Sequence, residues 1–230
     1  MRTLSGAVLV VVMALGAGGI GCSDGDSGGS VVSCATRFCA CSDGVTVEDT
    51  ATGLLWERKT GTFDASFPAS AICGTAPGGC PDPHDVNNRY QWSSTGTAAD
   101  GDAYTDFLAS LNTGSFAGHA DWRLPIISEL QSILVEAGVT GVSTSVDPID
   151  PAMGTNPTGQ ATTCAGPPCI DPGFAAVGGP TALSGYWSTS SDVTFPSGAW
   201  NAGFFDGREV IGSKGGDSFV RAVRAGSCSS

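Results

Sequence analysis

The stretch Asp121-Trp122-Arg123-Leu124-Pro125, with the run to Ala137 behind it, constrains the fold more than any other part of the chain. Trp122 and Leu124 are typical of the buried end of a short strand. Pro125 ends that strand, because proline has no N–H to donate to a ladder. An apolar face at helical spacing follows and predicts a helix. Its residues are Leu130, Ile133, Leu134 and Ala137.

The boundaries of this helix also have sequence signals. Ser128 and Gln131 have the spacing of a capping box, and Gly138 is a natural residue for the position after the last turn. The sequence therefore predicts a strand-to-helix corner with bulky buried side chains.

Four blocks of sequence, in order from Val45 to Arg224, resemble the Lcl C-terminal domain family, named after a Legionella collagen-like protein. The blocks are Asp49-Thr50-Ala51-Thr52-Gly53-Leu54-Leu55-Trp56, Trp122-Arg123-Leu124-Pro125 with Glu129-Leu130, Tyr186-Trp187-Ser188-Thr189-Ser190 with Ala199-Trp200, and Val220-Arg221-Ala222-Val223-Arg224. One departure is Ile126, which stands where the family often has a threonine N-cap. The resemblance implies a C-type-lectin-like arrangement in which both chain ends meet in one sheet.

The order of the expected elements predicts an α+β fold, with strands, then two helices, then strands again. The first helix should run from Ala103 to about Asn112, with Asp102 as its cap. Asp206-Gly207 is a two-residue hairpin signal. The expected strands are Val45–Glu48, Leu54–Glu57, Arg89–Ser93, Gly185–Ser188, Ala199–Phe205, Arg208–Ile211 and Phe219–Arg224.

The N-terminus has the pattern of an export signal. Arg2 precedes an apolar run from Leu4 to Leu15, which is too short for a membrane span, and the run leads to Gly21-Cys22. This is typical of a bacterial lipoprotein signal over residues 1–21, with Cys22 as the lipidated residue. A Gly/Ser/Asp tether follows over 22–33. One domain then covers 34–228, with an irregular excursion at 140–180.

Nine cysteines agree with export. With Cys22 set aside, an even number remains, which indicates a set of disulfides in an exported chain. We expect two local pairs, Cys73 with Cys80 and Cys164 with Cys169. The other four should pair among themselves, with at least one bridge joining the N-terminal arm to the C-terminal end, and their connectivity stays open. They are Cys34, Cys39, Cys41 and Cys228.

The charge of the chain argues against nucleic acid and other polyanions as partners. The precursor carries a net charge of −12, and the domain without Arg2 keeps nine basic residues against 22 acidic ones. Members of the resembled family bind sulfated glycosaminoglycans, which requires clustered basic residues. A glycan ligand of this chain should therefore be neutral.

Catalytic patterns are absent from the sequence. Its two histidines, His84 and His119, have the character of loop or packing residues. No nucleophile elbow, zinc-protease motif, phosphate loop or dinucleotide fingerprint occurs. The resembled fold also hosts formylglycine-generating enzymes, but these need an active cysteine pair that is not recognisable here. We expect no enzyme.

Calcium is the one cofactor with a sequence signal. Asp100, Asp102 and Asp106 place carboxylates at positions 1, 3 and 7, without the later Gly and Glu of an EF-hand loop. The alternative is a turn and a helix cap formed by the same residues.

Arginines and tryptophans are expected to be structural for the most part. Arg123, Arg221 and Arg224 should pair with carboxylates such as Asp121 or Glu129. Most of the tryptophans should be core, with one or two near the loop at 140–180 as candidates for stacking on sugar rings. They are Trp56, Trp92, Trp122, Trp187 and Trp200.

These observations predict a non-enzymatic, lipid-anchored domain on the bacterial outer membrane or cell surface. Its expected role is adhesion or ligand binding, with a neutral glycan as the candidate ligand. A structural or protein-interaction role in the cell envelope is the alternative, and an enzyme is the distant third.

Overall fold

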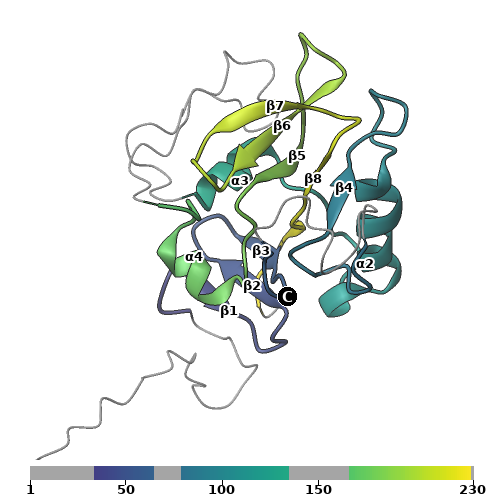
Figure 1. Ribbon diagram of the computed structural model, residues 1–230. Coiled ribbons are helices and arrows are strands. Elements are labelled where there is room, and N and C mark those ends of the chain that lie inside the picture. The colour runs from purple at the N-terminus through teal and green to yellow at the C-terminus, as the bar shows by residue number, and fades with distance from the viewer. Residues whose placement is uncertain (1–33, 65–78, 135–165, 229–230) are drawn as a thin grey trace, which may run out of the picture.

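The computed structural model describes residues 34–64, 79–134 and 166–228, and its described parts form an α+β domain with two sheets (Figure 1). The first sheet has the order β1-β2-β3-β9, and all of its neighbours are antiparallel. Its strands are β1 (Phe38–Ala40), β2 (Thr46–Asp49), β3 (Leu54–Glu57) and β9 (Val223–Ala225). The first and last strands of the domain thus share one sheet, as expected for the chain ends.

The second sheet has the order β4-β8-β5-β6-β7 and is mixed, because β5 and β8 run parallel where Tyr186 faces Phe219. Its strands are β4 (Arg89–Gln91), β5 (Gly185–Ser191), β6 (Gly198–Gly203), β7 (Glu209–Ser213) and β8 (Asp217–Phe219). In Figure 1 this sheet lies above the first one, and the β5–β6 hairpin points away from the end where β1 and the C-terminus lie.

The expected strand Phe219–Arg224 is wrong as a single element. Phe219 ends β8 in the second sheet and Val223 begins β9 in the first. Val220, Arg221 and Ala222 cross between the sheets and are all buried. Alternation of apolar and polar residues marks a strand that has one face in solvent. It therefore cannot show where a strand ends in a segment that is buried on all sides.

The corner around Pro125 lies beside the first sheet. Arg123 and Val223 exchange both backbone hydrogen bonds, at 3.0 and 2.9 Å, so Arg123 forms a single bridge to the sheet next to β9 where a short strand was expected. Trp122 and Leu124 are 2 % and 0 % exposed, which confirms the prediction that they are core.

The helix after this corner, α3 (Ile127–Ser132), starts and ends earlier than expected. Its N-cap is Ile126, whose N–H donates to the Glu129 side chain at 2.9 Å, and Ser128 caps nothing. The hydroxyl of Ser190 on β5 accepts from the N–H of Ile127 instead. The sequence signal failed because the residue that satisfies this N–H lies 63 positions away.

The other helices are short. The expected helix from Ala103 is present as the π-helix η1 (Ala103–Leu108) and α2 (Ala109–Thr113), followed by the 3-10 turn η2 (Phe116–Gly118). Asp102 does not cap it, since its carboxylate accepts from Gln91 N instead.

The helix α4 (Pro172–Val177) corrects the expectation of an irregular excursion at its C-terminal end. Asp171 caps it by accepting from the N–H groups of Gly173 and Phe174. Phe174 is fully buried and packs edge-on against Phe38 and Trp56. The part of the excursion at 140–165 lies outside the described residues.

The turn between β6 and β7 differs from the predicted two-residue hairpin. Gly203 N donates to Arg208 O at 2.7 Å, so the loop spans residues 204–207. Phe204 is not paired with β7, because its N–H donates to Ser184 O on the β5 side and its side chain is buried. Only Gly207 of the predicted turn has a positive φ, at 75°.

Candidate functional site

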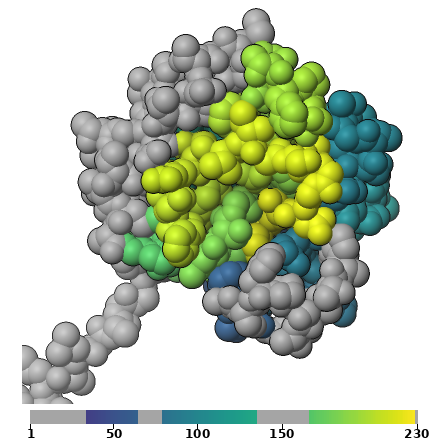
Figure 2. Space-filling model, turned by 45° about the horizontal axis from the view of Figure 1, so that its top comes forward, coloured from purple at the N-terminus to yellow at the C-terminus, as the bar shows by residue number. Residues whose placement is uncertain are grey.

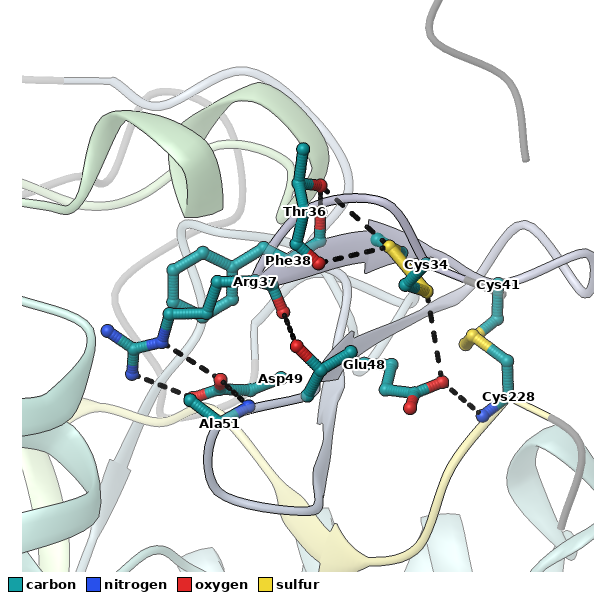
Figure 3. Close-up of a disulfide and its surroundings, with 11 residues drawn as sticks. Cys34, Thr36, Arg37, Phe38, Cys41, Glu48, Asp49, Ala51 and Cys228 are labelled. Carbon is teal, nitrogen blue, oxygen red and sulfur yellow. Dashed lines mark hydrogen bonds and ion pairs between the residues drawn. A yellow bond between two sulfur atoms is a disulfide. The ribbon is translucent and has the colours of Figure 1, made fainter. Parts of the chain in front are cut away.

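A cysteine clasp joins the N-terminal arm to the C-terminal end; we use this name for Cys34, Cys39, Cys41, Cys228 and Glu48. Disulfides link Cys34 to Cys39 and Cys41 to Cys228, with Cα–Cα distances of 5.8 and 5.1 Å. Glu48 faces Cys39 in the β1–β2 register, and its Oε2 accepts from Cys228 N at 2.9 Å. Figure 3 shows the Glu48 carboxylate between the two bridges. The predicted bridge between the two ends of the domain is confirmed.

The other predicted bridges are described in part. Cys80 and Cys169 are both disulfide-bonded. Cys73 and Cys164, their expected partners, lie outside the described residues, as does Cys22.

The clasp also holds the only cluster of three potential metal-ligating groups in the described parts of the chain. Ligand atoms of Cys34, Glu48 and Cys228 lie within 4.8 Å of one another. Both sulfur atoms are in disulfides, however, and a metal requires the thiolate. In this oxidised form the cluster therefore offers a single ligand, the carboxylate.

The residues of the proposed calcium site do not converge. The Asp100 carboxylate accepts from Ser93, Ser94 and Thr95, and the hydroxyl of Thr95 is the largest cause of a pKa of about 2 for Asp100. The Asp102 carboxylate accepts the N–H of Gln91 on β4. Among the described residues, Asp100, Asp102 and Asp106 do not form a cluster of three ligand atoms. Asp100 thus belongs to a turn, as the alternative predicted, but Asp102 does not cap the helix.

A buried ionic cluster lies where the two sheets meet, around the carboxylate of Glu57 on β3. Glu57 Oε1 is 2.8 Å from Lys59 Nζ and 2.8 Å from His84 Nδ1, and Oε2 accepts from Ala222 N. Arg221 donates to the carbonyl oxygens of Glu57 and Gly178. The cluster thus joins β3, the loop before β4, the crossing between the sheets, and the end of α4.

The electrostatics of this cluster favour an ionised Glu57. Burial alone would raise its pKa, but the ammonium of Lys59 and the ring of His84 bring it below the usual value. Burial lowers the pKa of Lys59 despite the opposing effect of Glu57. His84 also stacks on Phe116, with ring centroids 4.2 Å apart. His84 is therefore a packing residue, as the sequence predicted, but it belongs to a charged network that the sequence did not reveal.

Five large apolar side chains are exposed around β6 and β7: Val193 and Phe195 in the loop between β5 and β6, Phe205 in the loop between β6 and β7, and Val210 and Ile211 on β7. Of these, Phe195 and Ile211 lie together, and we call this pair the apolar surface; the two side chains are 51 % and 39 % exposed. A methyl group on Gly198 would lie 2.5 Å from Cγ2 of Ile211 and 2.6 Å from Cδ1 of Phe195, so these two side chains cover the glycine together. In Figure 2, β5, β6 and β7 lie side by side on the face turned to the viewer.

The five tryptophans take no part in this surface. Their exposed fractions range from 0 % to 5 %, so all of them are core and none is placed to stack on a sugar. The expectation that one or two serve a binding loop is wrong. Sequence pattern missed the exposed phenylalanines because a single apolar residue in a turn resembles ordinary surface variation.

The basic residues after Arg2 all lie in the described ranges, and each has a partner. Arg58, Lys214 and Arg221 donate to carbonyl oxygens, and Arg89 is also engaged. The predicted pairing of Arg123 and Arg224 is confirmed, whereas Arg221 uses backbone oxygens. The ion pairs are Arg37–Asp49, Lys59–Glu57, Arg123–Glu129, Arg208–Asp206 and Arg224–Asp121.

Comparison with known proteins decides the family. The model of the Lcl C-terminal domain matches residues 45–224, which is most of the chain. The chain belongs to the Lcl C-terminal domain family. The match begins just before β2 and ends within β9, so it takes in the strands of both sheets except β1. No curated protein and no solved structure matches the chain.

In the ranges that the structure describes, no helix is both long and apolar enough to cross a bilayer.

Proposed function

We propose that this Lcl C-terminal domain is a non-enzymatic binding module, exported and anchored to the outer membrane or cell surface by a lipid on Cys22. The apolar surface of Phe195, at the β5–β6 turn, and Ile211, on β7, is the observation that carries the binding role. Large exposed hydrophobic side chains that lie together commonly mark a contact site.

The position of the apolar surface suits an anchored protein. The arm that follows the proposed tether enters the first sheet at β1, whereas the β5–β6 hairpin lies at the far end of the second sheet (Figure 1). A domain held by its N-terminus presents that far end away from the membrane. Ligands outside the cell would then meet Phe195 and its neighbours first.

The charges favour a neutral ligand. A sulfated glycan is bound by clustered cations, and here each described cation already has a partner. The remaining excess of acidic residues would repel a polyanion. We therefore propose a neutral glycan, held by stacking on Phe195 and by hydroxyl hydrogen bonds. Calcium is not needed for this mode of binding.

The proposed fold type is C-type-lectin-like. Two features support it: the chain ends share one antiparallel sheet, and a second, mixed sheet carries the loops.

A glycan array on the mature domain tests the binding role. We expect binding to neutral oligosaccharides that changes little with salt and is lost in Phe195→Ser and Ile211→Ser. Val45→Ser is the matched control, because Val45 is 37 % exposed but lies next to the first sheet. Tight binding to heparin that weakens steeply with salt would contradict the proposal.

The lipid anchor has a separate test. Cys22→Ser should move the protein from the membrane fraction to the soluble fraction, and labelled fatty acid should enter only the wild type.

A structural or protein-interaction role in the envelope is the second candidate. β7 is the last strand in the order of its sheet, and Val210 and Ile211 on it are exposed. An edge strand of this kind adds strands from other proteins readily. A blank glycan array together with an envelope protein cross-linked at β7 would favour this role. Free thiols or a bound metal would instead point to an enzyme.

A further inference from the structure

The two disulfides of the cysteine clasp come close to each other through one sulfur atom of each. Sγ of Cys34 and Sγ of Cys228 belong to different bridges and lie within 4.8 Å of one another. Both of these residues are partly exposed, whereas Cys39 and Cys41 are buried, at 6 % and 5 %. The two cysteines that face each other are therefore the ones that a soluble thiol can approach.

We propose that Cys34 and Cys228 are an exchange site for thiols, so that reduction of either bridge leads to one common form with a Cys34–Cys228 bridge. The co-reactant is a dithiol, either a small molecule or the dithiol of an oxidoreductase. It attacks the accessible sulfur atom of one bridge, and its second thiol completes the reduction. The dithiol becomes a disulfide, and two cysteine thiols are left in the clasp.

The exchange step can start with the reduction of either bridge. If Cys34–Cys39 is reduced, the Cys34 thiolate attacks Sγ of Cys228. A Cys34–Cys228 bond forms, the Cys41–Cys228 bond breaks, and the electron pair leaves with Cys41, which takes up a proton. If Cys41–Cys228 is reduced first, the Cys228 thiolate attacks Sγ of Cys34 and expels Cys39 in the same way. Both routes end with Cys39 and Cys41 as thiols.

Glu48 lies beside the attacking sulfur atom and opposes its negative charge. Its Oε2 lies 4.0 Å from Sγ of Cys34 and is held in place by the N–H of Cys228. The thiolate is the nucleophile in thiol exchange, and a carboxylate at this distance disfavours it, so Glu48 slows the exchange and protects the native pairing.

The common form keeps the arm joined to the C-terminal end. A bridge between these two ends closes the longest loop in the domain, and long loops lose the most conformational entropy when they are closed. After exchange the missing bridge is therefore the local one between Cys34 and Cys39, and a long closure is kept.

The variant Cys39→Ser tests the exchange without a reductant, because it leaves Cys34 as a thiol beside the intact Cys41–Cys228 bridge. At pH 8, alkylation and peptide mapping should find label on Cys41 as well as on Cys34, with a Cys34–Cys228 peptide. The matched control is Cys34→Ser, whose thiol on Cys39 lies outside the cluster of facing atoms. There the label should stay on Cys39.

Wild-type protein treated with one equivalent of dithiothreitol provides a check that needs no variant. We expect label on Cys39 and Cys41. Two results together would overturn the proposal. One is label confined to Cys34 and Cys39 in the wild type, and the other is an intact Cys41–Cys228 bridge in Cys39→Ser. In Cys39→Ser/Glu48→Gln the exchange should be roughly threefold or more faster than in Cys39→Ser, and an unchanged rate would remove Glu48 from the mechanism.

Discussion

Nζ of Lys59 lies 2.8 Å from Oε1 of Glu57, and both side chains are almost completely buried. The same oxygen is 2.8 Å from His84 Nδ1, and the second oxygen accepts the N–H of Ala222. A single carboxylate thus satisfies groups from three segments that are far apart in the sequence. Removing one partner of such a pair leaves a buried charge without compensation.

Lys59→Ala should therefore lower the free energy of unfolding by about 3–5 kcal/mol. Urea unfolding measures the change. Arg58→Ala is the matched control, because Arg58 is the exposed neighbour and its guanidinium donates to Gly44 O, so its loss should be within about 0.5 kcal/mol. Equal losses in the two variants would show that the buried pair does not stabilise the fold. In Lys59→Met/Glu57→Gln the loss should be smaller than in Lys59→Ala.

A second buried carboxyl predicts how stability depends on pH. Burial raises the pKa of Glu209 from 4.5 to about 7, and the charge of Asp206 acts in the same direction. In the described structure neither carboxyl oxygen has a partner at normal hydrogen-bond geometry, and the weak contacts to its own N–H and to the Gln131 side chain oppose the rise only in part. Because the folded pKa is the higher one, the stabilising effect is complete below pH 4.5 and is lost as the pH rises through about 7.

Glu209→Gln should remove this dependence and raise the free energy of unfolding at pH 8 by about 3 kcal/mol relative to wild type. Urea unfolding between pH 4.5 and 8 measures it. Asp206→Asn serves as the control, since Asp206 is exposed and contributes only a small part of the shift. A wild-type protein equally stable at pH 5 and pH 8 would contradict the role given to Glu209.

Local pattern predicted the strands and the aromatic core well. The runs at Leu54–Glu57 and at Gly185–Ser188 are strands, and Trp122 is core, because burial of bulky residues on a pleated surface leaves its mark within a few positions. Family blocks extended this to the whole domain, since each block coincides with a strand or a corner of the first or second sheet.

Features that depend on distant partners were not predictable. The split between β8 and β9 follows from Arg221, which binds carbonyl oxygens of Glu57 and Gly178 between the sheets. The start of α3 depends on Ser190, and α4 is too short to show a helical period. The candidate site was missed for the same reason: Phe195 and Ile211 meet only because β6 and β7 pair over Gly198.

Trp122→Ala should cost about 3–5 kcal/mol of stability through the cavity it leaves. The indole N–H donates to Phe116 O at 2.9 Å. The Asn112 side-chain amide donates to Trp122 O and accepts from Trp122 N. Trp122→Phe, which keeps most of the volume, should cost clearly less. A Trp122→Ala protein that kept its melting temperature but lost glycan binding would identify Trp122 as a ligand contact.

The last prediction compares the two bridges of the cysteine clasp with each other. Cys41–Cys228 spans 187 positions and Cys34–Cys39 spans 5, so the chain-entropy model gives contributions of about 5 and about 2 kcal/mol. The variants Cys41→Ser/Cys228→Ser and Cys34→Ser/Cys39→Ser each remove one bridge without leaving a thiol for exchange. Urea unfolding should therefore show the first double variant to be less stable than the second by about 3 kcal/mol. Equal stability of the two would mean that the long closure does not hold the arm to the sheet, and that the β1–β2 ladder alone fixes it.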